Sequence, residues 1–153
     1  METKQLSIKV KMQVGKTRNE VFEAIVNPDS MKKYFIGSST GRMETGKKLQ
    51  WTFPEFDEII PVQINTITPN ELISFYWDNS GTQLLVEIYL TDSLQGSTLI
   101  TITEKSMPIS DAGLQWLSGN SFGWSNFLSC LKAYLEYGIN LRKGAFDFMS
   151  IKP

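Results

Sequence analysis

The sequence contains no histidine and only one cysteine, Cys130, among its 153 residues. Zinc sites in proteins are built from several imidazole or thiolate ligands, so this chain has no set of residues with which to build one. The acidic residues show no calcium-loop spacing, and no glycine-rich phosphate-binding motif follows a predicted strand. We therefore expect no bound metal, no dinucleotide and no other cofactor.

The single cysteine also limits thiol chemistry. Cys130 cannot form a disulfide within the chain, which fits a reducing compartment. A catalytic thiol normally has a neighbouring base, and the usual base, histidine, is missing here. We therefore interpret Cys130 as a small, buried, apolar residue.

Long hydrophobic runs are absent as well. The residues from Leu6 to Val14 alternate between apolar and polar, whereas a signal peptide has a basic start followed by a continuous apolar run. We predict neither a signal peptide nor membrane insertion, and we expect a cytoplasmic protein.

Neither sign of charge is in excess. Fifteen Lys and Arg residues against sixteen Asp and Glu residues leave a net charge of −1, which gives no reason to expect a nucleic acid as partner. The first third has a local basic bias, which fits either a solvated face or a contact surface for an acidic partner. The basic residues concerned are Lys32, Lys33, Arg42, Lys47 and Lys48.

The length and composition predict one domain spanning residues 1–153. A chain of this size buries roughly 70% of its unfolded surface, which is enough for a hydrophobic core. No stretch rich in Pro, Ser or Gly and no run of like charges indicates a linker or a disordered tail.

The first quarter of the chain predicts a strand followed by two short helices. Leu6 to Val14 have the period-two pattern of a strand with one solvated face. Thr17 and Glu20 have the spacing of a capping box at a helix start. Asn27-Pro28 ends that helix and can begin the next one. A turn around Glu44-Thr45-Gly46 then follows a short strand.

The middle of the chain predicts an antiparallel meander. Five segments alternate or are rich in β-branched and aromatic residues: 48–53, 58–67, 71–77, 82–92 and 97–105. The turns that join the later segments are too short for a parallel crossover. Pro61 predicts an edge position or a bulge, since it cannot donate a ladder hydrogen bond.

The last third predicts one long amphipathic helix within Ser121–Lys143. Its apolar residues recur at steps of three and four: Trp124, Phe127, Leu128, Leu131, Tyr134, Leu135 and Ile139. Gly119 and Gly123 lower helix propensity, so we expect the helix to begin near Asn120 or Ser121, with Leu114–Leu117 as a separate turn. The meander has one face to bury and this helix is the long element left to cover it, which predicts a two-layer α+β domain.

Four stretches of this sequence resemble the AHSA-type family, named for homologues of the activator of the heat-shock protein 90 ATPase, within the START/polyketide-cyclase (Bet v 1-like) superfamily. They are VGKTRNEVFEAIVNPDSMKKYF, LQWTF, LTDSLQGSTLITITE and GWSNFLSCLKAYLEYG, and they span nearly the whole chain. The resemblance implies a helix-grip fold, in which a curved antiparallel sheet wraps around a long C-terminal helix and leaves an apolar cavity.

The first functional hypothesis is that this cavity binds a small hydrophobic or amphipathic ligand. Plain core packing explains the same aromatic residues without a ligand. Trp116 lies near the entrance if the segment before the helix acts as a lid. The proposed lining residues are Phe35, Trp51, Phe53, Tyr76, Trp116, Trp124, Phe127 and Leu131.

Two other hypotheses belong to different classes. The domain could dock on a larger protein, as the family name implies for a chaperone regulator in the stress response, and it could be a monomer or a homodimer. It could also be a cavity enzyme of the cyclase or hydrolase type, although we judge an enzyme less well supported. Without histidine, the possible catalytic groups are carboxylates, Lys, Tyr and Cys130, and Glu104 is the one to test first. Its ordinary interpretation is a strand-end carboxylate in water or paired with a lysine.

Overall fold

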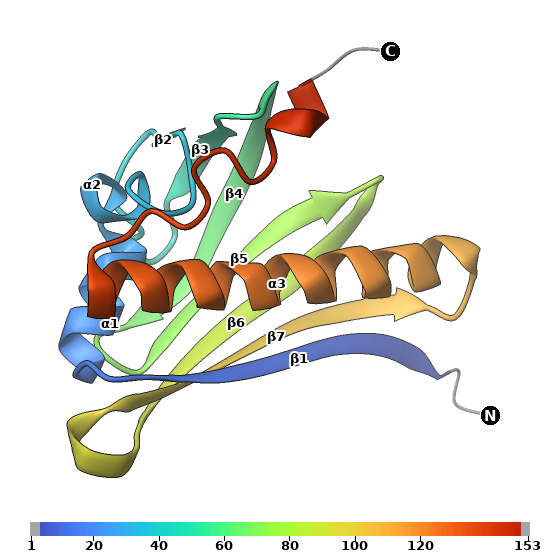
Figure 1. Ribbon diagram of the computed structural model, residues 1–153. Coiled ribbons are helices and arrows are strands. Elements are labelled where there is room, and N and C mark those ends of the chain that lie inside the picture. Colours follow the sequence, from blue (N-terminus) through green and yellow to red (C-terminus); the bar gives the residue numbers. More distant parts are fainter. Residues whose placement is uncertain (1–3, 151–153) are drawn as a thin grey trace.

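The computed structural model describes residues 4–150 (Figure 1). The remaining residues of the predicted domain, 1–3 and 151–153, lie outside the described residues. The elements follow in the order β1 (Gln5–Val14), α1 (Arg18–Val26), α2 (Pro28–Met31), β2 (Ser38–Ser39), β3 (Lys48–Phe53), β4 (Phe56–Thr68), β5 (Leu72–Asn79), β6 (Thr82–Asp92), η1 (Leu94–Gly96), β7 (Thr98–Pro108), α3 (Asp111–Tyr137) and η2 (Asp147–Ser150).

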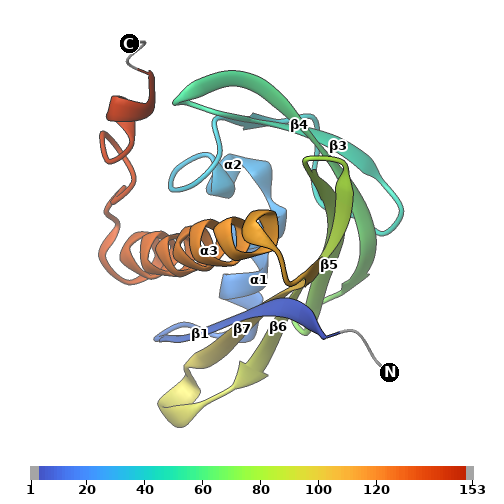
Figure 2. The same ribbon diagram turned by 90° about the vertical axis from the view of Figure 1, so that its right-hand side faces the viewer.

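The strands form one antiparallel sheet in the order β1-β7-β6-β5-β4-β3-β2, so the predicted meander is confirmed. The sheet is curved, and α3 lies along its concave face (Figure 2). This is the helix-grip arrangement that the sequence resemblance implied. The pairing of β1 with β7 brings the first strand beside the last one, from Gln5 opposite Pro108 to Val14 opposite Thr98.

The two short helices form where the sequence predicts them. The Thr17 hydroxyl accepts a hydrogen bond from the Glu20 backbone N–H at 3.2 Å. The Asn27 side chain caps α2 by accepting from the backbone N–H of Asp29 at 3.0 Å. Pro28 has no N–H to give to the carbonyl of Ala24, and the buried Tyr34 hydroxyl donates to that carbonyl at 2.8 Å instead. This bond joins α1 to the segment that follows α2.

The structure corrects the predicted start and end of the long helix. α3 is continuous from Asp111 to Tyr137, so Leu114–Leu117 is part of it rather than a separate turn. Gly119 and Gly123 each cost about 1 kcal/mol of helix propensity, but burial of Trp116 before them and Trp124 after them outweighs this cost.

The helix stops at Gly138, which adopts the left-handed conformation with φ 66°. Ile139, which the sequence pattern assigned to the apolar stripe, lies beyond the helix and is exposed. No helix within residues 4–150 is long and apolar enough to cross a lipid bilayer.

The core fills the space between the concave face of the sheet and α3. The strand alternation places Leu49, Trp51 and Phe53 of β3 in this core, together with the alternate residues Leu84, Val86, Ile88 and Leu90 of β6. Ile60 continues the alternation of the buried residues Val62 and Ile64 of β4 but is only partly buried. It lies in the part of β4 that pairs with β3 alone, because pairing between β4 and β5 begins at Gln63 and Tyr76.

Candidate ligand-binding site

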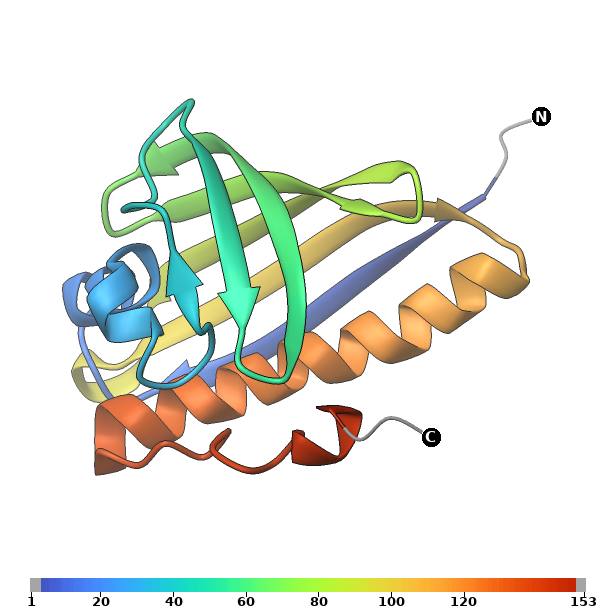
Figure 3. The same ribbon diagram turned by 90° about the horizontal axis from the view of Figure 1, so that it is seen from above.

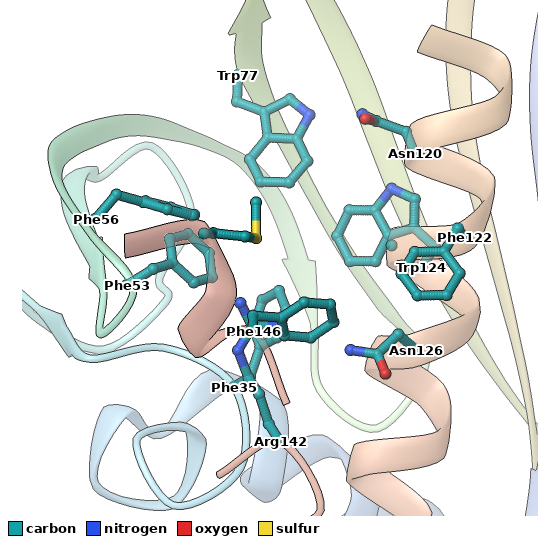
Figure 4. A pocket seen from close by; sticks show the side chains of 12 residues that line it. Phe35, Phe53, Phe56, Trp77, Asn120, Phe122, Trp124, Asn126, Arg142 and Phe146 are labelled. Carbon is teal, nitrogen blue, oxygen red and sulfur yellow. The ribbon is translucent and has the colours of Figure 1, made fainter. Parts of the chain in front are cut away.

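A pocket of about 250 Å³ lies between the sheet, α3 and the C-terminal segment, by which we mean residues 138–150. We call it the aromatic pocket (Figure 4). Its lining is mostly aromatic and comes from regions far apart in the sequence: Phe35, Phe53, Phe56, Trp77, Asn120, Phe122, Gly123, Trp124, Asn126, Arg142, Phe146 and Met149.

The C-terminal segment forms the outer wall of the aromatic pocket. Because Gly138 turns the chain at the end of α3, the segment runs back alongside the helix (Figures 1 and 3). The Arg142 guanidinium stacks on the rings of Phe35 and Phe53, each at 5.4 Å, and on Phe146 at 4.7 Å. Phe146 also meets the ring of Phe122 edge-on at 6.3 Å, which joins the wall to α3.

An ion pair holds this wall to the sheet. Arg142 donates from Nε and Nη2 to the two carboxylate oxygens of Glu55, both at 3.2 Å. Glu55 lies in the turn between β3 and β4. The side chains of Arg142 and Glu55 are only 13% and 5% exposed, so the pair is largely shielded from water.

Glu104 lies at the inner end of the pocket, behind Trp77 and Trp124. It has no exposed surface, because the alternation of β7 that buries Ile100 and Ile102 also turns Glu104 inward. The ordinary interpretation, a carboxylate in water or paired with a lysine, is therefore wrong. The neighbouring Lys105 pairs with Glu87 at 3.3 Å instead.

Four side chains donate hydrogen bonds to the Glu104 carboxylate, and all of them are neutral. The indole N–H groups of Trp77 and Trp116 donate to Oε2, both at 3.1 Å. The indole N–H of Trp124 donates to Oε1 at 2.7 Å, and Asn120 Nδ2 lies 3.2 Å from both oxygens. We call these four residues the Glu104 cage.

The cage depends on the helical spacing of α3. Trp116, Asn120 and Trp124 are four residues apart, so they occupy one face of the helix. Trp77 reaches the same carboxylate from β5, where it shares a face with Phe75. An ionised carboxylate only accepts hydrogen bonds, and this cage supplies only donors. The cage ties β5, β7 and α3 together at one point.

A second opening, which we call the side hollow, adjoins the pocket with a volume of about 380 Å³. It lies where β4 and β5 separate, beside Pro61 and Asp78. Pro61 cannot donate to a ladder, and this part of β4 pairs only with β3, which agrees with its predicted edge position. Trp77 and Asn120 line both the aromatic pocket and the side hollow.

The structure brings together only some of the residues that the sequence proposed as lining. Phe35, Phe53 and Trp124 line the aromatic pocket. Trp116 lies in the Glu104 cage, within α3 and not in a lid. Tyr76 lies on the opposite face of β5 from Phe75 and Trp77. The other three, Trp51, Phe127 and Leu131, are fully buried in the core.

Sequence reasoning missed the lining residues that lie outside the predicted apolar stripe. The aromatic pair Phe146 and Phe148 in the C-terminal segment was the available signal, because exposed aromatic residues beyond a helix end need a surface to pack on. Phe146 packs against Arg142 and Phe122. The missed residues are Phe56, Trp77, Asn120, Phe122, Gly123, Asn126, Arg142, Phe146 and Met149.

Solved structures of other proteins share this fold. The protein SSP2350 from Staphylococcus saprophyticus is 36% identical, with a TM-score of 0.79 over 90% of this chain and 96% of that chain. DynU16, from the dynemicin biosynthetic locus, is 21% identical, with a TM-score of 0.77 over 88% of this chain and 48% of that chain. The Aha1 dimer from Colwellia psychrerythraea is 16% identical, with a TM-score of 0.74 over 87% of this chain and 98% of that one.

The sheet, the gripped helix and the pocket between them define a START/Bet v 1-like α+β domain. Residues 16–136 match the family described as activator of Hsp90 ATPase homolog 1-like protein, and this chain belongs to that family. No protein of curated function matches the sequence. The matched region ends one residue before the end of α3, so the C-terminal segment that forms the pocket wall lies outside it.

Proposed function

We propose that this protein binds a small hydrophobic or amphipathic molecule in the aromatic pocket and does not catalyse a reaction on it. The observation that carries this proposal is the lining, which is largely aromatic and includes few polar groups. Concave apolar pockets with a few fixed polar groups are typical ligand sites. The volume of about 250 Å³ favours a ligand of one or two rings.

The environment of Glu104 supports binding over catalysis. A general acid or base must come within hydrogen-bond reach of its substrate. Both oxygens of Glu104 are already occupied by the four donors of the cage, and the side chain is fully buried. A ligand in the pocket would meet the ring faces of Trp77 and Trp124 before it met the carboxylate.

The predicted basic region gives little support to the alternative of docking on a larger protein. Arg42 forms a two-bond pair with Glu23, at 2.9 and 2.6 Å. Lys47 and Lys32 pair with Glu44 and Asp29. None of the exposed large hydrophobic residues lies between positions 32 and 48. This surface fits a solvated face better than a contact surface.

A pair of glycine substitutions in α3 tests the proposal. A Cβ added at Gly123, which lines the pocket, or at Gly119, which does not, would meet no atom within 4 Å. We expect Gly123→Leu to fill the pocket, whereas Gly119→Leu is the matched control with the same gain in helix propensity.

The measurement is isothermal titration calorimetry with 2-naphthol, together with a thermal shift. Wild type and Gly119→Leu should bind the probe. At a probe concentration 100 times Kd, their free energy of unfolding should rise by about 2.7 kcal/mol. Gly123→Leu should bind at least roughly five-fold more weakly, because its side chain occupies probe space. A wild-type protein that shows no thermal shift with 2-naphthol or with a panel of other apolar one- and two-ring compounds would contradict the proposal.

A further inference from the structure

We propose that the ligand of the aromatic pocket donates a hydrogen bond, from a hydroxyl or an N–H group, to Oδ1 of Asn120. This inference rests on the proposed function and names the chemical class of its ligand. Glu104 is then a positioning residue, which sets the preference through the orientation of the Asn120 amide.

The orientation of Asn120 follows from its contact with Glu104. Its Nδ2 lies 3.2 Å from each carboxylate oxygen. Turning the amide around would place Oδ1 against those oxygens, so that two acceptors would face each other without a proton between them. The amide is therefore held with Nδ2 toward Glu104 and Oδ1 away from it.

The acceptor end of this amide is available to a ligand. Asn120 is partly exposed and lines both the aromatic pocket and the side hollow. Within residues 4–150, the Asn120 side chain forms hydrogen bonds only through Nδ2, and no side chain or backbone group donates one to its Oδ1. Figure 4 shows Asn120 beside Trp77 and Trp124 at the same end of the pocket.

The remaining polar groups of the lining are mostly donors that already have partners. The indole N–H groups of Trp77 and Trp124 point to Glu104, and Arg142 gives Nε and Nη2 to Glu55. Among the residues that the structure describes, the amide of Asn126, which also lines the pocket, has no side-chain hydrogen bond that would fix its orientation. Asn120 Oδ1 is thus the fixed acceptor of the pocket, and a donor on the ligand satisfies it.

Two probes with the same rings test this inference. 2-Naphthol has a hydroxyl that can donate, and 2-methoxynaphthalene carries an oxygen that can only accept. We expect wild-type protein to bind 2-naphthol about five-fold more tightly by isothermal titration calorimetry, the value of one ordinary hydrogen bond. Asn120→Ala should bind both probes with similar affinity.

The sharpest variant is Glu104→Gln. The new amide brings its own N–H donors into a cage whose three indoles can only donate. Asn120 is the only cage residue with an acceptor, so its amide should turn to accept a hydrogen bond from the introduced glutamine. That turn would present Nδ2 to the pocket, so the preference should reverse in favour of 2-methoxynaphthalene. Asn126→Ala, at the other asparagine of the lining, should change both affinities in the same proportion.

The outcomes separate this inference from the proposed function. Equal wild-type affinities for the two probes, or a hydroxyl preference that survives in Asn120→Ala, would overturn the inference while leaving ligand binding in place. Failure of wild-type protein to bind either probe would overturn the proposed function and this inference with it. If Glu104→Gln does not fold, the Asn120→Ala result decides the matter alone.

Discussion

Two buried carboxylates flank the aromatic pocket, and the protein satisfies them in different ways. Glu104, at the inner end, is held by three indoles and an amide, all neutral. Glu55, at the outer wall, is held by the charged Arg142. The inner arrangement joins two strands to α3, within the region that matches the family, whereas the outer one fixes a segment beyond it.

The difference indicates what each end of the pocket does. Neutral donors satisfy a buried carboxylate without the cost of removing a cation from water, and salt does not screen them. The inner end is therefore a structural joint of the fold. An ion pair on a short segment can be exchanged or released without unfolding the sheet, so the outer wall is the part of the pocket that can change without loss of the fold.

The largest effect should come from breaking the inner joint. Trp124→Ala removes a buried indole that packs on Phe75, Trp77 and Phe127, and it should lower the free energy of unfolding by about 3–5 kcal/mol. Trp124→Phe keeps a ring but leaves Glu104 with one donor fewer, and should cost roughly 1–3 kcal/mol. Urea unfolding monitored by circular dichroism measures both.

The control for this comparison is Leu114→Ala, since Leu114 is an exposed residue of the same helix and does not line the pocket. We expect it to change the free energy of unfolding by less than about 0.5 kcal/mol. A loss below about 1 kcal/mol for Trp124→Ala would mean that α3 does not pack on the sheet as described.

Breaking the outer ion pair should have a smaller effect on stability and a larger one on the pocket. Arg142→Met keeps an unbranched chain against Phe35 and Phe53 but leaves Glu55 nearly buried without its cation. We expect a loss of roughly 1–3 kcal/mol in the free energy of unfolding, because Glu55 can regain water when the segment moves. Adding Glu55→Gln should recover most of that loss.

The salt dependence of stability distinguishes the interactions of Glu55 from those of Glu104. The coupling free energy of Arg142 and Glu55, from a double-mutant cycle, should fall modestly as the salt concentration rises from 0.1 to 1 M, since the Debye length shrinks from about 10 Å to about 3 Å. The fall is smaller than for an exposed pair, because the two side chains are only 13% and 5% exposed. The coupling between Trp124 and Glu104 should stay nearly constant. Equal salt dependence of the two couplings would remove the distinction between the two ends of the pocket.

The fold could be predicted from the sequence because its signals are local. Strand alternation and short turns fixed the antiparallel order of β3 to β7, and the resemblance supplied the grip of the sheet on α3. The start of α3 was misplaced because the propensities of Gly119 and Gly123 are local costs, whereas the burial of Trp116 and Trp124 depends on tertiary contacts.

The site was less predictable because its polar parts depend on contacts between distant segments. Three lining residues could be predicted from the sequence. Trp124 belongs to the apolar stripe of the helix, and Phe35 and Phe53 are aromatic residues of apolar segments. Nothing near Arg142 in the sequence indicates a partner at Glu55, 87 residues away. The inward position of Glu104 follows from the parity of β7, but its partnership with Asn120 requires the register between β7 and α3.

The smallest effect concerns a third buried ionisable group, Tyr34. Its hydroxyl donates a hydrogen bond to the Ala24 carbonyl, whereas the two carboxylates accept hydrogen bonds. Burial raises the pKa of the Tyr34 hydroxyl well above 10, with Tyr134 and Cys130 adding to the effect. The unfolded chain loses this proton above pH ~10 and the folded protein keeps it. The contribution of Tyr34 is therefore complete below pH ~10 and is lost as the pH rises toward the folded pKa, by about 1.4 kcal/mol for each pH unit.

Tyr34→Phe isolates this contribution, because every other tyrosine is unchanged. At pH 7 the variant should lose about 1 kcal/mol in the free energy of unfolding. The reason is that the Ala24 carbonyl, to which Pro28 cannot donate, loses the hydrogen bond from Tyr34. Between pH 10 and 11 the wild-type protein should destabilise faster than the variant, so that their urea midpoints converge. If the free energy of unfolding fell equally with pH in both proteins, the Tyr34 hydroxyl would be open to water. Tyr34 would then be less well shielded than Glu104 is in its cage.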